Sequence, residues 1–211
     1  MDVLISILAL LGFILLTAST GLFVAIEFAM TGLERSVLEA HVQEKGDKTA
    51  KAVQRDHSNL SFVLSGAQLG ITLTTLATGF LAEPVLARFF GPVLELVGLN
   101  ESASSAVAVV LALIVATILS MVFGELVPKN IAITNPLGTA RFVVPPVNAF
   151  NTVFAWFIKA MNAAANWFVR KMGIEPADEL ASARSGPELG AMVRSSAQAG
   201  GLDQELSLIH I

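Results

Sequence analysis

Long apolar runs alternate with short polar segments along this chain. Residues 3–32, 60–82 and 103–123 form three such runs, and Glu27 is the one charged residue in them. A helix needs about 20 predominantly apolar residues to cross the hydrocarbon core of a bilayer. The pattern therefore predicts an all-α integral membrane protein with three transmembrane helices.

Composition supports this prediction. The 211 residues are 54% hydrophobic and 14% charged, whereas soluble domains average about 45–50% apolar and about 25% charged residues. The chain contains no cysteine, which excludes disulfides, thiolate metal sites and a cysteine nucleophile. The net charge is −4 and no basic cluster is present, so we expect no nucleic-acid partner.

The polar segments differ in Lys and Arg content. Segment 34–59 contains five of these residues, segment 83–102 contains Arg88 alone, and none precedes the first run. Cytoplasmic loops of membrane proteins carry an excess of Lys and Arg. This bias predicts that segment 34–59 and the C-terminus are cytoplasmic and that the N-terminus lies outside.

Segment 141–172 has two interpretations. As a fourth span it would place Lys159 near mid-membrane, at a cost of about 3 kcal/mol, and would put Arg170 and Lys171 outside. As an amphipathic helix at the interface it would show one apolar stripe and two headgroup-level tryptophans. The residues concerned are Phe150, Phe154, Phe157 and Met161 in the stripe, with Trp156 and Trp167 as anchors. We favour the interfacial helix, separated from the third run by Pro145 and Pro146.

The other polar segments are also expected to be helical in part. Leu33, Val37, Ala40 and His41 share one helical face in segment 34–59, and Gly46-Asp47 predicts a break. Residues 176–211 are polar and predict a short linker helix. The final "LSLIHI" does not fit that helix, and we base nothing on it.

Polar residues inside the apolar runs are candidates for function. Glu27 is either a functional acid or an interface residue that pairs with Arg35 or Lys129. Gly66 and Gly70 are spaced i, i+4, which lets helices approach closely. Gln68 and Thr72 share a face, and they either bind a partner helix or supply neutral oxygens to a cation.

The stretch "GELVPKN" follows the third run. Pro128 has no N–H and clashes with the carbonyl of residue i−4, which is Gly124. A helix break here would free that carbonyl beside Glu125, and hard cations prefer oxygen ligands. The alternative is an ordinary helix end with a Glu125–Lys129 pair.

The stretches "FVAIEFAMTGLERSVLEA", "AQLGITLTTLATGFLAEP" and "GELVPKNIAI" together resemble the membrane domain of the CNNM/CorC family. These are hemolysin-like, CBS-containing magnesium and cobalt transporters. The resemblance covers nearly the whole chain. It implies a homodimeric transmembrane domain over residues 1–175, with three spans and a belt of juxtamembrane helices, in the plasma or inner membrane. Residues 176–211 would lead to paired CBS domains that this chain lacks.

The resemblance also implies divalent-cation transport, with Mg²⁺ exported as Na⁺ enters, and it makes Glu125 the acid that holds the ion. Two hydroxyl positions of related members are occupied here by Val24 and Ile26, and Gln68 stands nearest to an asparagine-rich stretch. The predicted site comprises Glu125, Gln68, Thr72, Glu27 and Gly124 as metal ligands, with Pro128, Lys129, Gly66 and Gly70 at the helix break and cavity.

A membrane-anchored cation sensor that does not transport is the alternative function. An enzyme is disfavoured, because the spans contain no His–acid pair, zinc signature or serine elbow. We expect membrane lipid as a partner and no organic cofactor.

Overall fold

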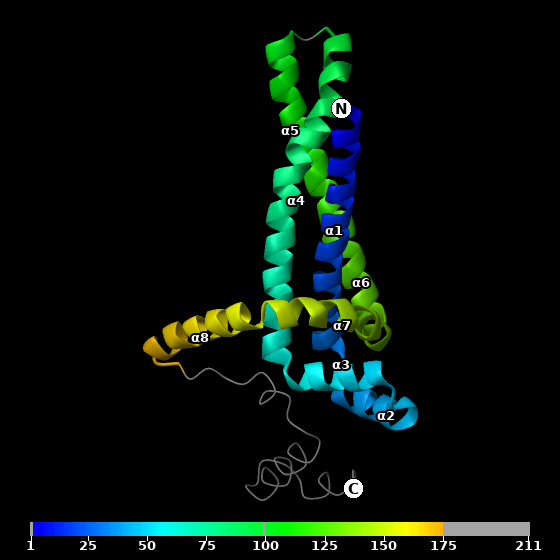
Figure 1. Cartoon of the computed structure of the whole chain (residues 1–211), viewed down its shortest axis with the longest axis vertical. Coiled ribbons are helices and arrows are strands. Elements are labelled where there is room, and N and C mark those ends of the chain that lie inside the picture. Colours follow the sequence, from blue (N-terminus) through cyan, green and yellow to red (C-terminus); the bar gives the residue numbers. More distant parts are fainter. Residues whose placement is uncertain (1, 99, 175–211) are drawn as a thin grey trace, which may run out of the picture. The chain divides into compact units, whose positions relative to one another are not determined.

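The computed structural model describes residues 2–98 and 100–174, and in these ranges the chain is helical and contains no strand. Figure 1 shows the arrangement of the helices. The elements are α1 (Asp2–Gly32), α2 (Arg35–Lys45), α3 (Lys48–Ser58), α4 (Leu60–Leu96), α5 (Glu101–Leu119), the π-helix η1 (Ser120–Leu126), α6 (Val127–Thr134), α7 (Pro136–Val153) and α8 (Ala155–Lys171). Residues 1–165 and 166–211 form two units, and the helical bundle belongs to the first.

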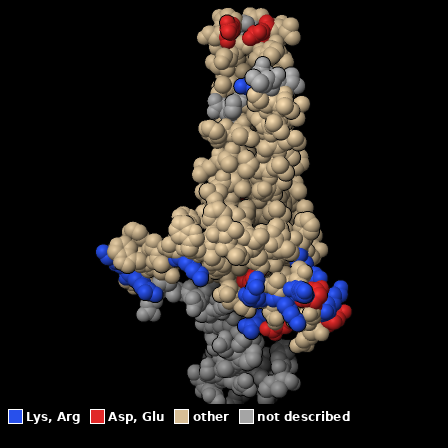
Figure 2. Space-filling model, viewed as in Figure 1, with Lys and Arg blue, Asp and Glu red and all other residues tan. Residues whose placement is uncertain are grey.

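Three helical stretches are long and apolar enough to cross a membrane: Leu4–Gly32, Leu60–Leu96 and Glu101–Thr134. They are α1, α4 and the continuous run of α5, η1 and α6, and they lie side by side (Figure 1). Figure 2 shows no charged side chain over the middle of this bundle, and charges at both of its ends. The predicted all-α membrane fold with three spans is therefore confirmed.

Helix α4 is longer than its apolar run predicted. Its 37 residues extend about 55 Å at 1.5 Å per residue, nearly twice the hydrocarbon thickness of about 30 Å. The part beyond Ala82 pairs with the start of α5, where the Ser104 hydroxyl donates to the Gly91 carbonyl at 2.9 Å. A helix that leaves the lipid can continue in water, so hydropathy alone predicted too early an end.

The main core lies where the last turns of α1 meet α2, α3 and α7. Ile26, Met30, Val53 and Val143 are fully buried there. Along the rest of the bundle α5 presents a row of small buried residues, Ala108, Ala112 and Ala116. Apolar burial drives packing weakly in lipid, so helices there associate through small residues that allow close approach.

The α2–α3 hairpin has the break that the sequence predicted. Gly46 adopts φ 53°, and the Asp47 carboxylate accepts from the Ala50 N–H at 2.7 Å to cap α3. Leu38 is the buried residue of α2, whereas Val37, one of the four residues predicted to share a helical face, is exposed. Arg141 of α7 donates to both oxygens of Asp47, at 3.2 and 2.5 Å, and so ties α7 to the hairpin.

Helix α7 corrects one prediction. Pro145 and Pro146 lie inside this helix and do not separate it from the third span. The chain turns earlier, at Asn135, whose side-chain oxygen caps α7 by accepting from the Gly138 N–H at 3.0 Å. Both prolines are exposed, and buried Val143, Val144 and Val147 hold the other face against the core. Tertiary packing thus outweighs the cost of proline in this helix.

Residues 141–172 form two helices, and neither is among the stretches that are long and apolar enough to cross a membrane. The segment is not among the candidate spans, and the backbone leaves helical geometry at Phe154. Phe150 and Phe154 are in ring contact, with centroids 4.6 Å apart, while Phe157, Met161 and Trp156 are exposed. The predicted stripe is therefore divided between α7 and α8, both amphipathic helices.

The second unit is described over residues 166–174 alone. In this unit the Lys171 ammonium lies 4.4 Å from the centre of the Trp167 ring. The predicted linker over residues 176–211 lies outside the described residues.

Candidate functional site

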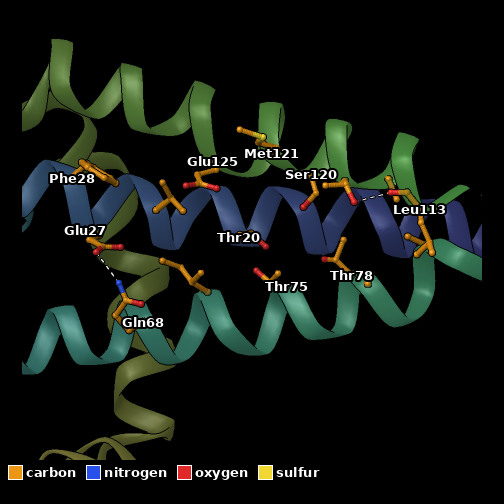
Figure 3. Close-up of a pocket in the computed structure, with 16 residues that line it drawn as sticks. Thr20, Glu27, Phe28, Gln68, Thr75, Thr78, Leu113, Ser120, Met121 and Glu125 are labelled. Carbon is orange, nitrogen blue, oxygen red and sulfur yellow. Dashed lines mark hydrogen bonds between the residues drawn. The ribbon is translucent and has the colours of Figure 1, made fainter. Parts of the chain in front are cut away.

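A cavity of about 670 Å³ lies between α1, α4 and the α5–η1 helix. Glu27 and Glu125 both line it, although 98 positions separate them in the sequence. Figure 3 shows both carboxylates and the Thr75 and Thr78 side chains within the space between these helices. The structure therefore brings two predicted site residues together in the membrane-spanning part of the chain.

The π-helix η1 brings Glu125 onto the cavity face. Leu113, Thr117 and Met121 of the same run line the cavity, at the i, i+4 spacing of one helical face. At about 100° per residue, a continuous α-helix would turn position 125 by about 120° from position 113 and present position 124 instead. The Val127 N–H bonds to the Val122 carbonyl, an i to i−5 bond that widens the turn. The wider turn explains why Glu125 faces the cavity.

Pro128 does not break the helix, which corrects the predicted interruption. The helix runs from η1 directly into α6, so Pro128 lies inside a continuous helical run although it is among the first residues of α6. Its ring packs on Gly21 of α1, where a Cβ would lie 2.9 Å from the Pro128 Cγ. Gly124 is buried beside Thr17 and Thr20 of α1 and does not line the cavity. The π-helix thus takes the place of the predicted break.

The Gln68 amide donates to a Glu27 carboxylate oxygen at 2.7 Å. This bond joins α1 to α4 across the cavity wall (Figure 3). Arg35, one of the two partners considered for Glu27, pairs instead with Glu39 at 2.7 Å. Glu27 is therefore held by a neutral amide and makes no ion pair with the described residues.

Among the described residues, Lys129 likewise makes no ion pair with an acid. Its ammonium lies 4.6 Å from the centre of the Phe28 ring, a distance at which cation and ring attract. In the described part of the chain, Glu125 makes no ion pair or side-chain hydrogen bond. The alternative of a helix end with a Glu125–Lys129 pair is thus not what the structure shows.

Gly66 and Gly70 act in helix packing. A Cβ on Gly70 would lie 2.5 Å from the Phe23 ring of α1, and a Cβ on Gly66 would overlap the Asn151 side chain of α7. Helices α1 and α7 therefore pack directly against the backbone of α4 at Gly70 and Gly66, respectively. Thr72 donates its hydroxyl to the Gln68 carbonyl at 2.8 Å and is not among the residues that line the cavity.

Hydroxyl groups on the cavity wall were missed in the sequence. Thr20, Thr75, Thr78, Thr117 and Ser120 line it. On α4, Gln68, Ile71, Thr75, Thr78 and Ala82 follow one another at intervals of three and four, the spacing of a single helical face. That spacing was a signal in the sequence, since it continues the Gln68 face along the span.

The donor set of the cavity consists of carboxylate, amide and hydroxyl oxygens, which suit Mg²⁺, Ca²⁺ or Mn²⁺. Over residues 2–98 and 100–174, no group of three His, Cys, Asp or Glu side chains is placed to hold a metal. A cation in this cavity would therefore have two acids at most, with neutral oxygens and water as its remaining ligands.

Comparison with known proteins adds to this geometry. Residues 10–206 match the family model of the cyclin M (CNNM) transmembrane N-terminal domain. The chain is 50% identical over 202 residues to UPF0053 protein MT1890 of Mycobacterium tuberculosis and spans 44% of that protein's length. It is 34% identical over 198 residues to UPF0053 protein YugS of Bacillus subtilis, of which it spans 46%. These matches cover 96% and 94% of this chain, respectively.

Proposed function

The chain belongs to the CNNM transmembrane-domain family, and from that premise we propose that it is the membrane domain of a divalent-cation transporter. The observation that carries the proposal is the cavity that Glu27 and Glu125 line together in the bundle. Ionisable groups in a membrane-spanning region are costly, and they commonly mark ion pathways. Two carboxylates that form no ion pair with the described residues provide an electrostatic reason for a cation to enter the cavity they line.

Mg²⁺ is the cation that we propose as cargo. It usually keeps several of its waters and uses one or two carboxylates, which matches the two acids here. Six waters at about 30 Å³ each need about 180 Å³, so a cavity of about 670 Å³ accommodates a hydrated ion. Few direct ligands also favour release, because conduction requires binding weak enough for the ion to leave.

The specific form of the proposal is Mg²⁺ export coupled to Na⁺ entry across the plasma or inner membrane, which rests on the sequence resemblance. The Lys and Arg content of segment 34–59 favours the α2–α3 end in the cytoplasm. We further propose a homodimer, since Leu76 and Phe80 of α4 are 68% and 82% exposed and are available to lipid or to a second copy.

Flux measurements on the protein reconstituted in liposomes test the proposal. Mg²⁺ movement is followed with an internal indicator while a Na⁺ gradient is imposed. We expect Glu125→Gln to reduce the flux to that of protein-free liposomes, because the amide removes the charge and keeps the shape. Glu95→Gln is the matched control, since Glu95 is an exposed acid near the far end of α4, and it should transport normally. Unchanged flux in Glu125→Gln would contradict the proposal.

The alternative is a membrane-anchored sensor that binds the cation without moving it. The observation that favours it is Val24, which lines the cavity at a position where the family resemblance leads us to expect a hydroxyl. Ile26 does not bear on the choice between transporter and sensor, since it is fully buried in the core and does not line the cavity. Mg²⁺ binding that depends on Glu125, together with no flux under any gradient, would establish the sensor instead.

A further inference from the structure

A second cavity, of about 340 Å³, lies in the α2–α3 hairpin. Its wall is polar apart from Leu38. The cations Arg35, Lys51 and Arg55 line it, with Glu39 as the one acid and His57 beside them. Lys and Arg side chains are prominent at this end of the molecule in Figure 2.

Positive charge is concentrated in this cavity relative to the rest of the hairpin. Segment 34–59 has five Lys or Arg and five Asp or Glu, and so is neutral with neutral histidines. The cavity wall has three cations and one acid, a net charge of +2. A pocket of this charge attracts an anion, and the guanidinium fork matches a phosphate group well.

The cations retain donors for such a ligand. Arg35 uses its Nε toward Glu39, and Arg55 uses Nε and one terminal nitrogen toward Asp56. Each guanidinium has five N–H donors, so donors remain on both. Lys51 is exposed and has no hydrogen bond or ion pair to any of the described residues. Its ammonium is therefore free to bind an added anion.

The cavity lies at the level where two membrane spans end. Arg35 comes three residues after the last residue of α1, and Ser58 comes two residues before the first residue of α4. The ring Nε2 of His57 lies 3.0 Å from the Leu33 carbonyl, to which it donates, and so ties the cavity wall to the end of α1. The cavity is thus lined by residues that directly follow one span and directly precede the other, and the ends of membrane spans lie near the lipid headgroups.

From this charge and this depth, we propose that the cavity between α2 and α3 binds the phosphate of an anionic lipid headgroup. A lipid is favoured over a soluble phosphate compound because its phosphate is held at the level of the cavity while its acyl chains lie against the apolar spans. The proposal does not depend on transport, since the site is separate from the cavity that Glu27 and Glu125 line.

Native mass spectrometry of the detergent-purified protein tests it, with phosphatidylglycerol and phosphatidylcholine of identical acyl chains. We expect phosphatidylglycerol to be retained more tightly. A surface cation contributes about a fivefold factor to the binding of anionic lipid. Lys51→Gln should therefore weaken phosphatidylglycerol binding about fivefold and leave phosphatidylcholine unchanged.

Lys48→Gln is the matched control. Lys48 is exposed on the same helix, but it does not line the cavity. Its removal should change phosphatidylglycerol binding much less than Lys51→Gln does. An equal loss in both variants would show diffuse attraction to the hairpin and overturn the proposal. Both variants should unfold at the wild-type temperature in lipid-free detergent, since neither lysine is buried.

Two further measurements separate the sources of phosphate. Glu39→Gln raises the net charge of the cavity and should tighten phosphatidylglycerol binding a few-fold, a gain that a purely structural role for Glu39 would not produce. Inorganic phosphate is added as a competitor at constant ionic strength. If millimolar phosphate displaces the lipid and binds as well without it, the site is one for a free anion and the lipid proposal is wrong.

Discussion

Acidic side chains occur at two levels of the bundle, and their partners differ. Near the hairpin end, Asp47 accepts from Arg141, and Asp56 accepts from Arg55 and from the Asn148 amide at 2.6 Å. In the large cavity, and among the described side chains, Glu27 has the neutral Gln68 amide as its one partner, and Glu125 has neither ion pair nor hydrogen bond. Charge is thus compensated where helices are joined and left uncompensated where the spans enclose a cavity.

This difference suggests different roles for the two groups of acids: the paired ones join helices, and the unpaired ones are candidates for cation binding. An ion pair fixes one helix against another, as Arg141 and Asp47 fix α7 against the hairpin. A carboxylate without a cationic partner forms no ion pair between helices, although Glu27 still accepts one hydrogen bond from α4, and it is costly in a membrane. A mobile cation in the large cavity would offset that cost, which is what the proposed transport function requires.

The largest expected effect comes from replacing one cavity acid and one hairpin acid, each by its amide. Glu27→Gln should slow Mg²⁺ flux about tenfold, the order seen when a group that supports a metal site is lost, and should barely change stability. Asp56→Asn should cost about 1–3 kcal/mol of unfolding free energy, since it disturbs a buried acceptor of two donors, and should leave flux per folded molecule unchanged. Flux assays and equilibrium unfolding in detergent measure the two effects.

The reverse result would contradict the assignment of function to the cavity acids. If Asp56→Asn abolished flux in fully folded protein while Glu27→Gln transported normally, the paired acid of the hairpin would be the functional one. Expression and monodispersity in detergent provide the control for folding in both variants.

The sequence predicted the spans because lipid imposes a minimum apolar length, and it predicted the turn at Gly46 and Asp47 because few residues adopt positive φ. It did not predict that helices continue through Pro128 or Pro145. Proline's local cost is offset there by contacts between distant segments, namely Pro128 on Gly21 and Val144 in the core. Such contacts have no signature in the neighbouring residues.

The sequence predicted which kinds of residue form the site better than it predicted which positions face the cavity. Glu27, Gln68 and Glu125 line the cavity, as the polarity of Glu27 and Gln68 within apolar runs and the position of Glu125 directly after one suggested. Thr72 and Gly124 do not line it, because helix register decides which neighbour faces inward, and the π-helix shifts that register. The wider turn of a π-helix cannot be inferred from residue types.

A smaller effect should distinguish packing from ion binding on α4. Gly70→Ala places a Cβ 2.5 Å from the Phe23 ring, and that ring is buried edge-on against Phe150 at 4.8 Å. Overpacking of this kind costs about 1–3 kcal/mol. Gly91→Ala meets nothing within 4 Å and should gain helix propensity. We expect Gly70→Ala to be about 2 kcal/mol less stable than Gly91→Ala.

Equilibrium unfolding of the two variants in detergent provides the measurement. Equal stability would mean that α1 and α4 separate easily at this point, and the close approach at Gly70 would not be a packing contact. Flux per folded molecule should be the same in both variants, since neither glycine lines the cavity.

The smallest effect concerns pH and the ion pair of the hairpin. Hydrogen bonds from Arg141 and from the Ala50 N–H lower the pKa of Asp47 from 3.8 to about 2. A carboxyl whose pKa is lower in the folded state stabilises that state above its unfolded pKa. This contribution is complete above about pH 4 and disappears as the pH falls through about 2. Asp47→Asn keeps the helix cap, since Asn caps as well as Asp, and removes only the charge.

The thermal midpoint of wild type should therefore fall more steeply than that of Asp47→Asn between about pH 4 and about pH 2, with little difference in slope above about pH 5. Glu44→Gln is the control, because Glu44 is an exposed acid on the same hairpin that forms no ion pair with the described residues of α7, and it should follow wild type. Parallel curves for wild type and Asp47→Asn would mean that Arg141 does not hold Asp47 in solution. The contrast between paired acids at the hairpin and unpaired acids in the cavity would then rest on Asp56 alone.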